Sequence, residues 1–224
     1  MSLRGPSLAR AAAIPFYQSL ILLFSGIASP RCCVTRNDNT MKRKHTTLGK
    51  HRFVFKGIIY NISHSTATLP DGRKKTFEFL HRVPTVVVLA FDAQRRLIVT
   101  KEYKELPKRF IWHLVVGKVE DGRTPKQAAQ KELQEEAGYK AKKLKLFYRS
   151  PLHKSWPLYG FIATGLTPSK LPGDPGEDIR TFPMSLAKAE QLALTNKIED
   201  PVLAFLVAKA AYVVRTKGWK ALLG

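Results

Sequence analysis

The spacing of apolar residues divides this chain into expected strands and helices. Residues 85–90 form a continuous apolar and β-branched run, which is typical of a central strand of a sheet. Other short runs predict strands at residues 51–60, 65–69, 73–80, 95–101, 110–116, 144–150, 159–166 and 179–184. Helical spacing and capping residues predict helices at residues 125–137, 185–195 and 200–217. The pattern therefore predicts a mixed sheet held between helices, of the α/β or α+β class.

The composition fits one globular domain with extensions, but the charge is unusual. The chain has 224 residues, of which 44% are hydrophobic, and its formal net charge is +21. The first 50 residues contain eight Lys or Arg against Asp38 alone, so residues 51–224 carry +14 of that charge. A surface this basic attracts polyanions, which makes RNA or a ribonucleoprotein complex a candidate partner; solubility alone is the alternative.

Residues 1–37 have the composition of a mitochondrial targeting segment. They contain no Asp or Glu, and they place four arginines among Ser and Ala. The uncharged stretch at residues 11–30 leaves a secretory signal, an anchor or a disordered tail as alternatives, although Pro15 and Gly26 weaken it as a membrane span. The only cysteines, Cys32 and Cys33, are adjacent and indicate a reducing compartment. We expect a mitochondrial protein without stable membrane insertion, with a basic linker at residues 38–51.

One expected helix, at residues 125–137, carries an acidic face. Thr124 is a plausible N-cap, with Pro125 at the first helical position and Gly138 as a stop. Spacings of three and four residues place three glutamates on one side of the helix: Glu132, Glu135 and Glu136. Their mutual repulsion is removed by a divalent cation, and Mg²⁺ prefers such oxygen ligands. A solvated acidic face is the alternative interpretation.

Residues 117–139 resemble the signature of the Nudix hydrolases. That signature is a glycine, a distant Glu, and then Arg-Glu, an aliphatic residue, any residue, Glu-Glu, a glycine and a closing aliphatic residue. Six positions of this chain fall in register: Gly117, Glu132, Leu133, Glu135, Glu136 and Gly138. Three positions depart from the signature. Arg123 stands in place of the first Glu, Lys131 in place of Arg, and Tyr139 in place of the closing aliphatic residue. Because Arg123 and Lys131 have the same sign, we expect repulsion where the family has an ion pair.

The resemblance extends over residues 52–212 and is to the ADP-ribose pyrophosphatase branch of the family. Trp-His-Leu-Val-Val-Gly at residues 112–117 lies where relatives have Trp-Glu-Leu-Pro-Ala-Gly. The resemblance implies a Nudix α/β/α sandwich with a mixed sheet at residues 83–217, preceded by a small antiparallel β subdomain at residues 52–82. The remaining residues 218–224 are expected to be a C-terminal tail. By analogy, the branch also implies a homodimer formed through residues 52–82.

The resemblance implies metal-dependent hydrolysis of a nucleoside diphosphate linked to another group. Mg²⁺ or Mn²⁺ would be held by Glu132, Glu136 and the carbonyl of Val116, with Glu135 completing or orienting the cluster. In this branch a late acidic loop often supplies the general base, which makes Glu177 the first candidate and Asp178 the second. Simple solvation of that loop is the alternative for both residues.

Residues that precede the acidic helix are candidates to bind the substrate. Lys101 and Lys104 suit phosphates, whereas Tyr103 and Trp112 could stack on a base or a ribose. Gly117 would lie beside the substrate at the opening of the signature. The alternative for the aromatic residues is a place in the core. His113 could likewise face a ligand or be packed.

Two functions from different classes follow. The first is a pyrophosphohydrolase acting on ADP-ribose, a related nucleotide or an RNA 5′ end. The second is an inactive or weakened Nudix fold that binds RNA within a mitochondrial ribonucleoprotein complex such as the ribosome. The three glutamates favour the enzyme, whereas Arg123, Lys131 and the net charge of +21 favour the binding protein.

Overall fold

The computed structural model describes residues 45–150 and 156–224, and the expected targeting segment at residues 1–37 lies outside them. The first described strands form a small antiparallel sheet in which β3 pairs with each of the other three. Their bounds are β1 (Thr47–Leu48), β2 (Arg52–Lys56), β3 (Tyr60–Thr68) and β4 (Lys74–Arg82). The hairpin expected around residues 70–72 joins β3 to β4. The run expected as one strand at residues 51–60 instead contains the turn between β2 and β3.

The second sheet has seven strands and is mixed, as expected. Its order is β11-β6-β5-β10-β9, with β7 paired to β6 and β8 paired to β5. The β5–β10 pair is parallel, whereas the other pairs are antiparallel. The bounds are β5 (Thr85–Phe91), β6 (Leu97–Lys104), β7 (Arg109–His113), β8 (Val115–Lys118), β9 (Tyr139–Arg149), β10 (Leu158–Pro168) and β11 (Ile179–Met184).

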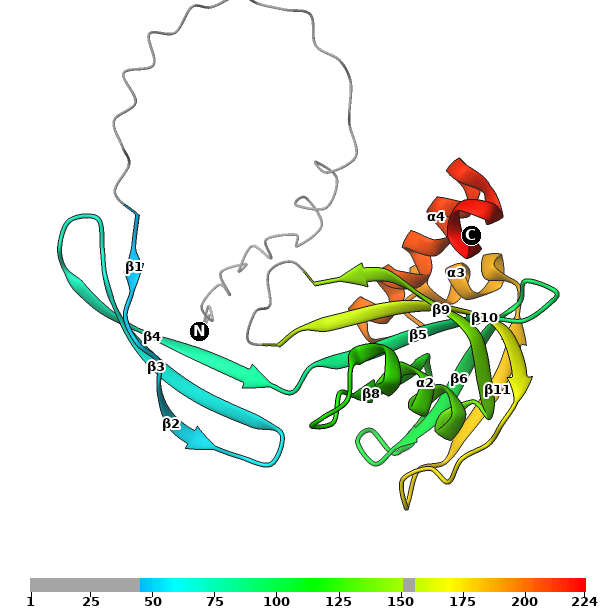
Figure 1. The fold of residues 1–224 in the computed structure, drawn as a ribbon, viewed down its shortest axis with the longest axis horizontal. Helices are drawn as coiled ribbons and strands as arrows, with labels where there is room; N and C mark the ends of the chain where they lie inside the picture. The colour runs from blue at the N-terminus through cyan, green and yellow to red at the C-terminus, as the bar shows by residue number, and fades with distance from the viewer. Residues whose placement is uncertain (1–44, 151–155) are drawn as a thin grey trace, which may run out of the picture. The chain divides into compact units, whose positions relative to one another are not determined.

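Three described helices cover the two faces of this sheet (Figure 1): α2 (Pro125–Glu136) on one side, and α3 (Leu186–Leu194) and α4 (Pro201–Leu223) on the other. Strand β5 explains the arrangement, because all seven of its side chains are buried and they alternate between two cores. Val87 and Leu89 pack with α3 and α4, whereas Val86 and Val88 pack with α2. The result is the expected α/β/α sandwich.

The C-terminal end differs from the expected tail. The long helix ends at Lys217 as expected, because Gly218 leaves the helical conformation with a φ of 77°, but a second helical stretch then continues to Leu223 within α4. Leu222 is only 1% exposed and belongs to the core on the α3 and α4 side, where Trp219 also packs. Residues 218–223 therefore help to close the core. In the part of the chain that the structure describes, no helix is long and apolar enough to cross a membrane.

Candidate active site

Helix α2 begins and ends where its capping residues predict. The Thr124 side chain accepts a hydrogen bond from the Gln127 backbone N–H, and Gln127 Oε1 accepts one from the Thr124 backbone N–H at 2.9 Å. Gly138 follows the C-terminus with a φ of 76°, a conformation that favours glycine. Ala128, Ala129 and Leu133 are buried against the sheet. These contacts fix the direction of the remaining side chains, including the glutamates.

Strand β8 approaches the acidic face of α2 closely. A Cβ added at Gly117 would lie 1.8 Å from Cδ of Glu132, so only glycine leaves room for that carboxylate. The adjacent Val116 backbone N–H donates a hydrogen bond to Oε2 of Glu136 at 3.2 Å. Residues 116 and 117 of β8 therefore contact two glutamates of the signature: Gly117 lies against Glu132, and Val116 is bonded to Glu136. The metal-binding role of the Val116 carbonyl stays a prediction.

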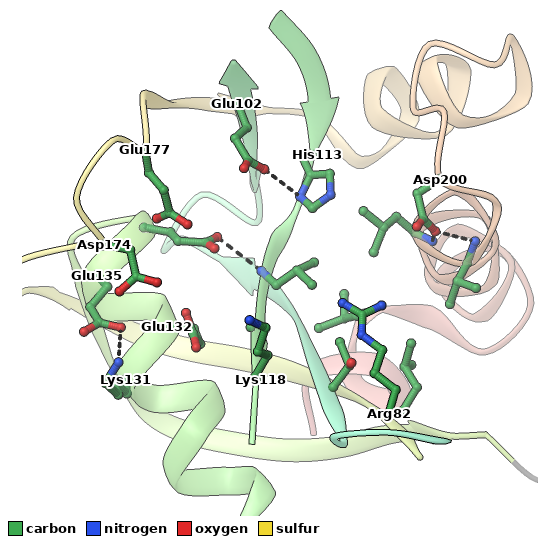
Figure 2. Close-up of a pocket in the computed structure, with 18 of the residues that line it drawn as sticks. Arg82, Glu102, His113, Lys118, Lys131, Glu132, Glu135, Asp174, Glu177 and Asp200 are labelled. Carbon is green, nitrogen blue, oxygen red and sulfur yellow. Dashed lines mark hydrogen bonds and ion pairs between the residues drawn. The ribbon is translucent and has the colours of Figure 1, made fainter. Parts of the chain in front are cut away.

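These residues line a cavity of about 460 Å³ (Figure 2), a size suited to a small-molecule ligand. Eight acidic residues line it, nearly half of the chain's 17, although the whole chain is strongly basic. They are Glu102, Glu120, Glu132, Glu135, Glu136, Asp174, Glu177 and Asp200. The basic residues that line it are Arg82, Lys104, Lys118 and Lys131, and His113 is also present. Negative charge is thus concentrated at this cavity, in contrast to the positive net charge of the whole chain.

Two of the glutamates on α2 lack sufficient positive charge nearby. Burial, followed by repulsion from Glu135 and Glu177, raises the pKa of Glu132 to about 7. Burial also raises the pKa of Glu136 well above its ordinary value, despite the hydrogen bond from Val116, and Glu132 adds to the effect. Glu135 differs because Lys131 Nζ donates to it at 2.6 Å. A bound cation would relieve the repulsion between Glu132 and Glu136.

The carboxylates have the chemistry of a site for a hard divalent cation but are not yet arranged as one. Within the described ranges, no three His, Cys, Asp or Glu side chains form a ready-made ligand set. Flexible glutamate side chains on a rigid helix can converge when a cation enters, since rotation about their side-chain bonds suffices. The donor set therefore fits Mg²⁺ or Mn²⁺.

The prediction that Arg123 and Lys131 repel each other where the family has an ion pair is wrong. Glu120, which the sequence interpretation passed over, forms ion pairs with both: its Oε2 lies 2.8 Å from Arg123 Nε, and its Oε1 lies 3.4 Å from Lys131 Nζ. Lys131, followed in effect by Arg123, lowers the pKa of Glu120. An acid three residues before Arg123 was the available signal. The ion pair between the loop and α2 is therefore retained, but Glu120 supplies the carboxylate in place of a residue at position 123.

The late acidic loop reaches the cavity through Glu177 and Asp174. Burial, followed by repulsion from Asp174, raises the pKa of Glu177. Asp178, the second candidate for the general base, instead forms an exposed ion pair with Arg180 at 3.1 Å. Asp174 was missed because a single acid in a Pro- and Gly-rich loop carries no spacing signal. The structure thus brings Glu177, but not Asp178, to the acidic helix.

Strand β6 separates the expected substrate-binding residues into two groups. Lys104 lines the cavity and is paired with Glu102, another acid that the sequence did not single out. Lys101 does not line it, but lies 4.3 Å from the centroid of the Trp112 ring. Tyr103, on the same side of the strand, contacts Phe110. Side chains alternate along a strand, so Glu102 and Lys104 point one way and Lys101 and Tyr103 the other.

Two neighbouring residues of β7 also have different surroundings. Trp112 packs against Phe182 with ring centroids 5.3 Å apart and against the core, in agreement with the alternative interpretation. His113 lines the cavity, and its Nδ1–H donates to the Leu114 carbonyl at 2.8 Å. Burial lowers the pKa of His113, although Glu102 lies 3.8 Å away, so a neutral imidazole is favoured. His113 therefore faces the cavity as a neutral polar group.

Comparison with known proteins gives a consistent picture. The family model described as NUDIX domain matches residues 81–205, more than half of the chain. An ADP-ribose pyrophosphatase from Bacillus subtilis (strain 168) is 29% identical over 174 residues, which cover 75% of this chain and 90% of that protein. A methanol dehydrogenase activator from Bacillus methanolicus is 24% identical over 152 residues, covering 66% and 82%. A solved structure described as an ADP compounds hydrolase superimposes with a TM-score of 0.67 at 18% identity, covering 78% and 97%, and shows the same fold.

The raised pKa of Glu132 predicts how stability varies with pH in the metal-free protein. Below pH 4.5 the carboxyl is protonated in both states, whereas between 4.5 and about 7 the unfolded state loses its proton first. Stability should therefore fall as the pH rises through this window and level off above it. We expect Glu132→Gln to reduce this fall, as measured by thermal unfolding in EDTA from pH 4.5 to 8.

The matched control is Glu105→Gln, at an exposed turn position, which should preserve the wild-type pH profile. Addition of Mg²⁺ at pH 8 should stabilise the wild type more than Glu132→Gln. Identical pH profiles for the wild type and Glu132→Gln would contradict this account of the site.

Proposed function

Because the chain belongs to the Nudix family of hydrolases, which act on pyrophosphate bonds, we propose that it cleaves the diphosphate of ADP-ribose or of a related nucleotide. The observation that carries the proposal is that eight acidic residues line one cavity of a basic protein, and that two of them, Glu132 and Glu136, have a raised pKa. The similarity to a protein described as an ADP-ribose pyrophosphatase supports this choice of substrate.

Glu132 and Glu136 are the residues proposed to hold Mg²⁺ or Mn²⁺, and Glu135 completes the cluster while it remains bonded to Lys131. When bound, the cation supplies positive charge to the phosphates and lowers the pKa of a coordinated water. Lys104 and Lys118 line the same cavity and are placed to contact phosphate oxygens. These residues offset the repulsion that otherwise keeps a nucleophile away from a diphosphate.

Glu177 is proposed as the general base. Its carboxylate accepts a proton from water as the water oxygen forms a bond to phosphorus and the P–O bond of the anhydride breaks. Cleavage of ADP-ribose in this way yields AMP and ribose 5-phosphate. The raised pKa of Glu177 supports this role, because a base is most effective when its pKa approaches the working pH.

The first test is hydrolysis of ADP-ribose and of triphosphorylated RNA in the presence of Mg²⁺. We expect Glu136→Gln to lower kcat/KM by about 100-fold or more, the size of loss that follows removal of one group that stabilises transition-state charge. Circular dichroism should show an unchanged fold, and Glu105→Gln should retain activity. Absence of hydrolysis by the wild type, together with copurification of RNA, would instead support the RNA-binding scaffold.

The second test compares two adjacent acids of the late loop. Glu177→Gln should lower kcat for ADP-ribose by about 10²–10⁴-fold, the usual contribution of a general base, with little change in KM. Asp178→Asn should have a small effect because its carboxylate is paired with Arg180 on the surface. The reverse ranking, from steady-state kinetics at several pH values, would assign the base to Asp178.

We also propose that the chain forms a homodimer through the small sheet. The exposed fractions of Phe53 and Phe55 on β2 are 50% and 55%, an apolar surface that a second copy could cover. Phe55→Asp should give a monomer by size-exclusion chromatography with light scattering. Leu194→Asp, at a residue that is 69% exposed on α3, is the control and should leave the dimer intact. A monomeric wild type would exclude this proposal.

Mitochondrial location is proposed from the acid-free, arginine-containing composition of residues 1–37. Fractionation of cells that express the tagged full chain tests it, and a purely cytosolic signal would refute it.

A further inference from the structure

Arg82, the last residue of β4, occupies an unusual position in the cavity wall. Its guanidinium lies 4.7 Å from the centroid of the Trp156 ring and 5.5 Å from that of Tyr60. The Trp156 indole N–H donates to Thr85 Oγ1 at 3.2 Å, which holds the ring in place. Two aromatic rings, one of them fixed by this hydrogen bond, thus position the Arg82 cation.

The hydrogen-bonding capacity of Arg82 is not satisfied by the described residues. Its Nε is buried and has no partner among them. Six other arginines in the described ranges form ion pairs with carboxylates: Arg73, Arg96, Arg109, Arg123, Arg180 and Arg215. A buried donor without a partner costs free energy, so a site that keeps one is suited to a ligand that supplies the acceptor.

The location of Arg82 separates it from the carboxylates that would hold the cation. In Figure 2, Glu132, Glu135 and Glu177 lie on one side of the cavity, Arg82 lies on the other, and Lys118 lies between them. Asp200 also lines this region, but its Oδ1 accepts from the Val202 and Leu203 backbone N–H groups as the cap of α4. Arg82 and Lys118 therefore leave a positively charged region beyond the proposed diphosphate site.

We propose that Arg82 determines specificity by binding a phosphate of the substrate other than the two that flank the cleaved bond. The inference rests on the proposed function and narrows its substrate class to nucleoside diphosphates with an additional phosphate, such as one on the ribose. The buried Nε has no partner among the described residues, so its N–H remains for the ligand. Together with a neighbouring guanidinium N–H it forms a planar fork that matches two oxygens of one phosphate group.

Binding of small nucleotides tests the site without requiring catalysis. Isothermal calorimetry would compare AMP with adenosine 2′,5′-bisphosphate and adenosine 3′,5′-bisphosphate, which differ from AMP by one phosphate. We expect the wild type to bind at least one bisphosphate about 10–100-fold more tightly than AMP, the usual range for charge-assisted hydrogen bonds. Arg82→Gln should abolish this preference, and Arg82→Lys should retain part of it.

Arg149→Gln is the matched control, since Arg149 also lies over an aromatic ring, Tyr159, but does not line the cavity. It should keep the wild-type preference. Equal affinity of the wild type for all three nucleotides, or an unchanged preference in a folded Arg82→Gln, would overturn the inference. A preference for GMP over AMP that depends on Arg82, without a preference for bisphosphates, would also overturn it, because Arg82 would then recognise a base edge.

Kinetics separate this inference from the proposed function. With ADP-ribose 2′-phosphate, Arg82→Gln should raise KM by about 10–100-fold with kcat unchanged, whereas both constants for ADP-ribose should change little. If neither compound is hydrolysed but the Arg82-dependent preference for bisphosphates persists, the hydrolase proposal fails and the phosphate site stands. If both are hydrolysed equally well by wild type and Arg82→Gln, the phosphate site fails and the hydrolase stands.

Discussion

The close approach of helix α2 to strand β8 is the constraint on which the site depends. Glu132 occupies the space where a side chain at residue 117 would lie, and Glu136 accepts a hydrogen bond from the Val116 backbone. This packing removes two carboxylates from water while leaving them next to a cavity. Because burial disfavours the charged form, the pKa of both carboxyls is raised above its ordinary value. The fold thus stabilises an arrangement that the side chains alone would avoid, and this is characteristic of a functional site.

Charge compensation around α2 is local and selective. Lys131 neutralises Glu135 and Glu120, but repulsion and burial still dominate at Glu132 and Glu136. The chain has 38 Lys and Arg residues, yet nearby positive charge does not offset the burial of Glu132 and Glu136. Although Arg123 departs from the family signature, Glu120 restores the ion pair between the loop and the helix from a different position. Arg123 and Lys131 are therefore weaker arguments against catalysis than the aligned signature alone indicates.

Much of the fold could be predicted from local sequence patterns. The caps of α2, the buried run of β5 and the bounds of β11 were clear because each depends on neighbouring residues. The end of the long helix at Lys217 was predictable from Gly218, whereas the second helical stretch up to Leu223 was not, because the burial of Leu222 depends on a distant core. Residues of the site were harder to predict where tertiary contact decides their role. The direction of Lys101 and Glu102 on β6 depends on the face that the strand presents, and Arg82 gains significance only through Trp156.

The two sides of the cavity impose opposite requirements on what can occupy it. A cation that binds alone is repelled by Lys118, Lys131 and Arg82. A polyanion that binds alone is repelled by the eight acidic residues. The proposed metal–nucleotide complex would satisfy both sides at once. By thermodynamic linkage, any factor by which the nucleotide strengthens cation binding is also the factor by which the cation strengthens nucleotide binding. In the proposed function, the net positive charge of the chain would draw a polyanionic substrate towards a cavity whose walls carry eight acidic residues.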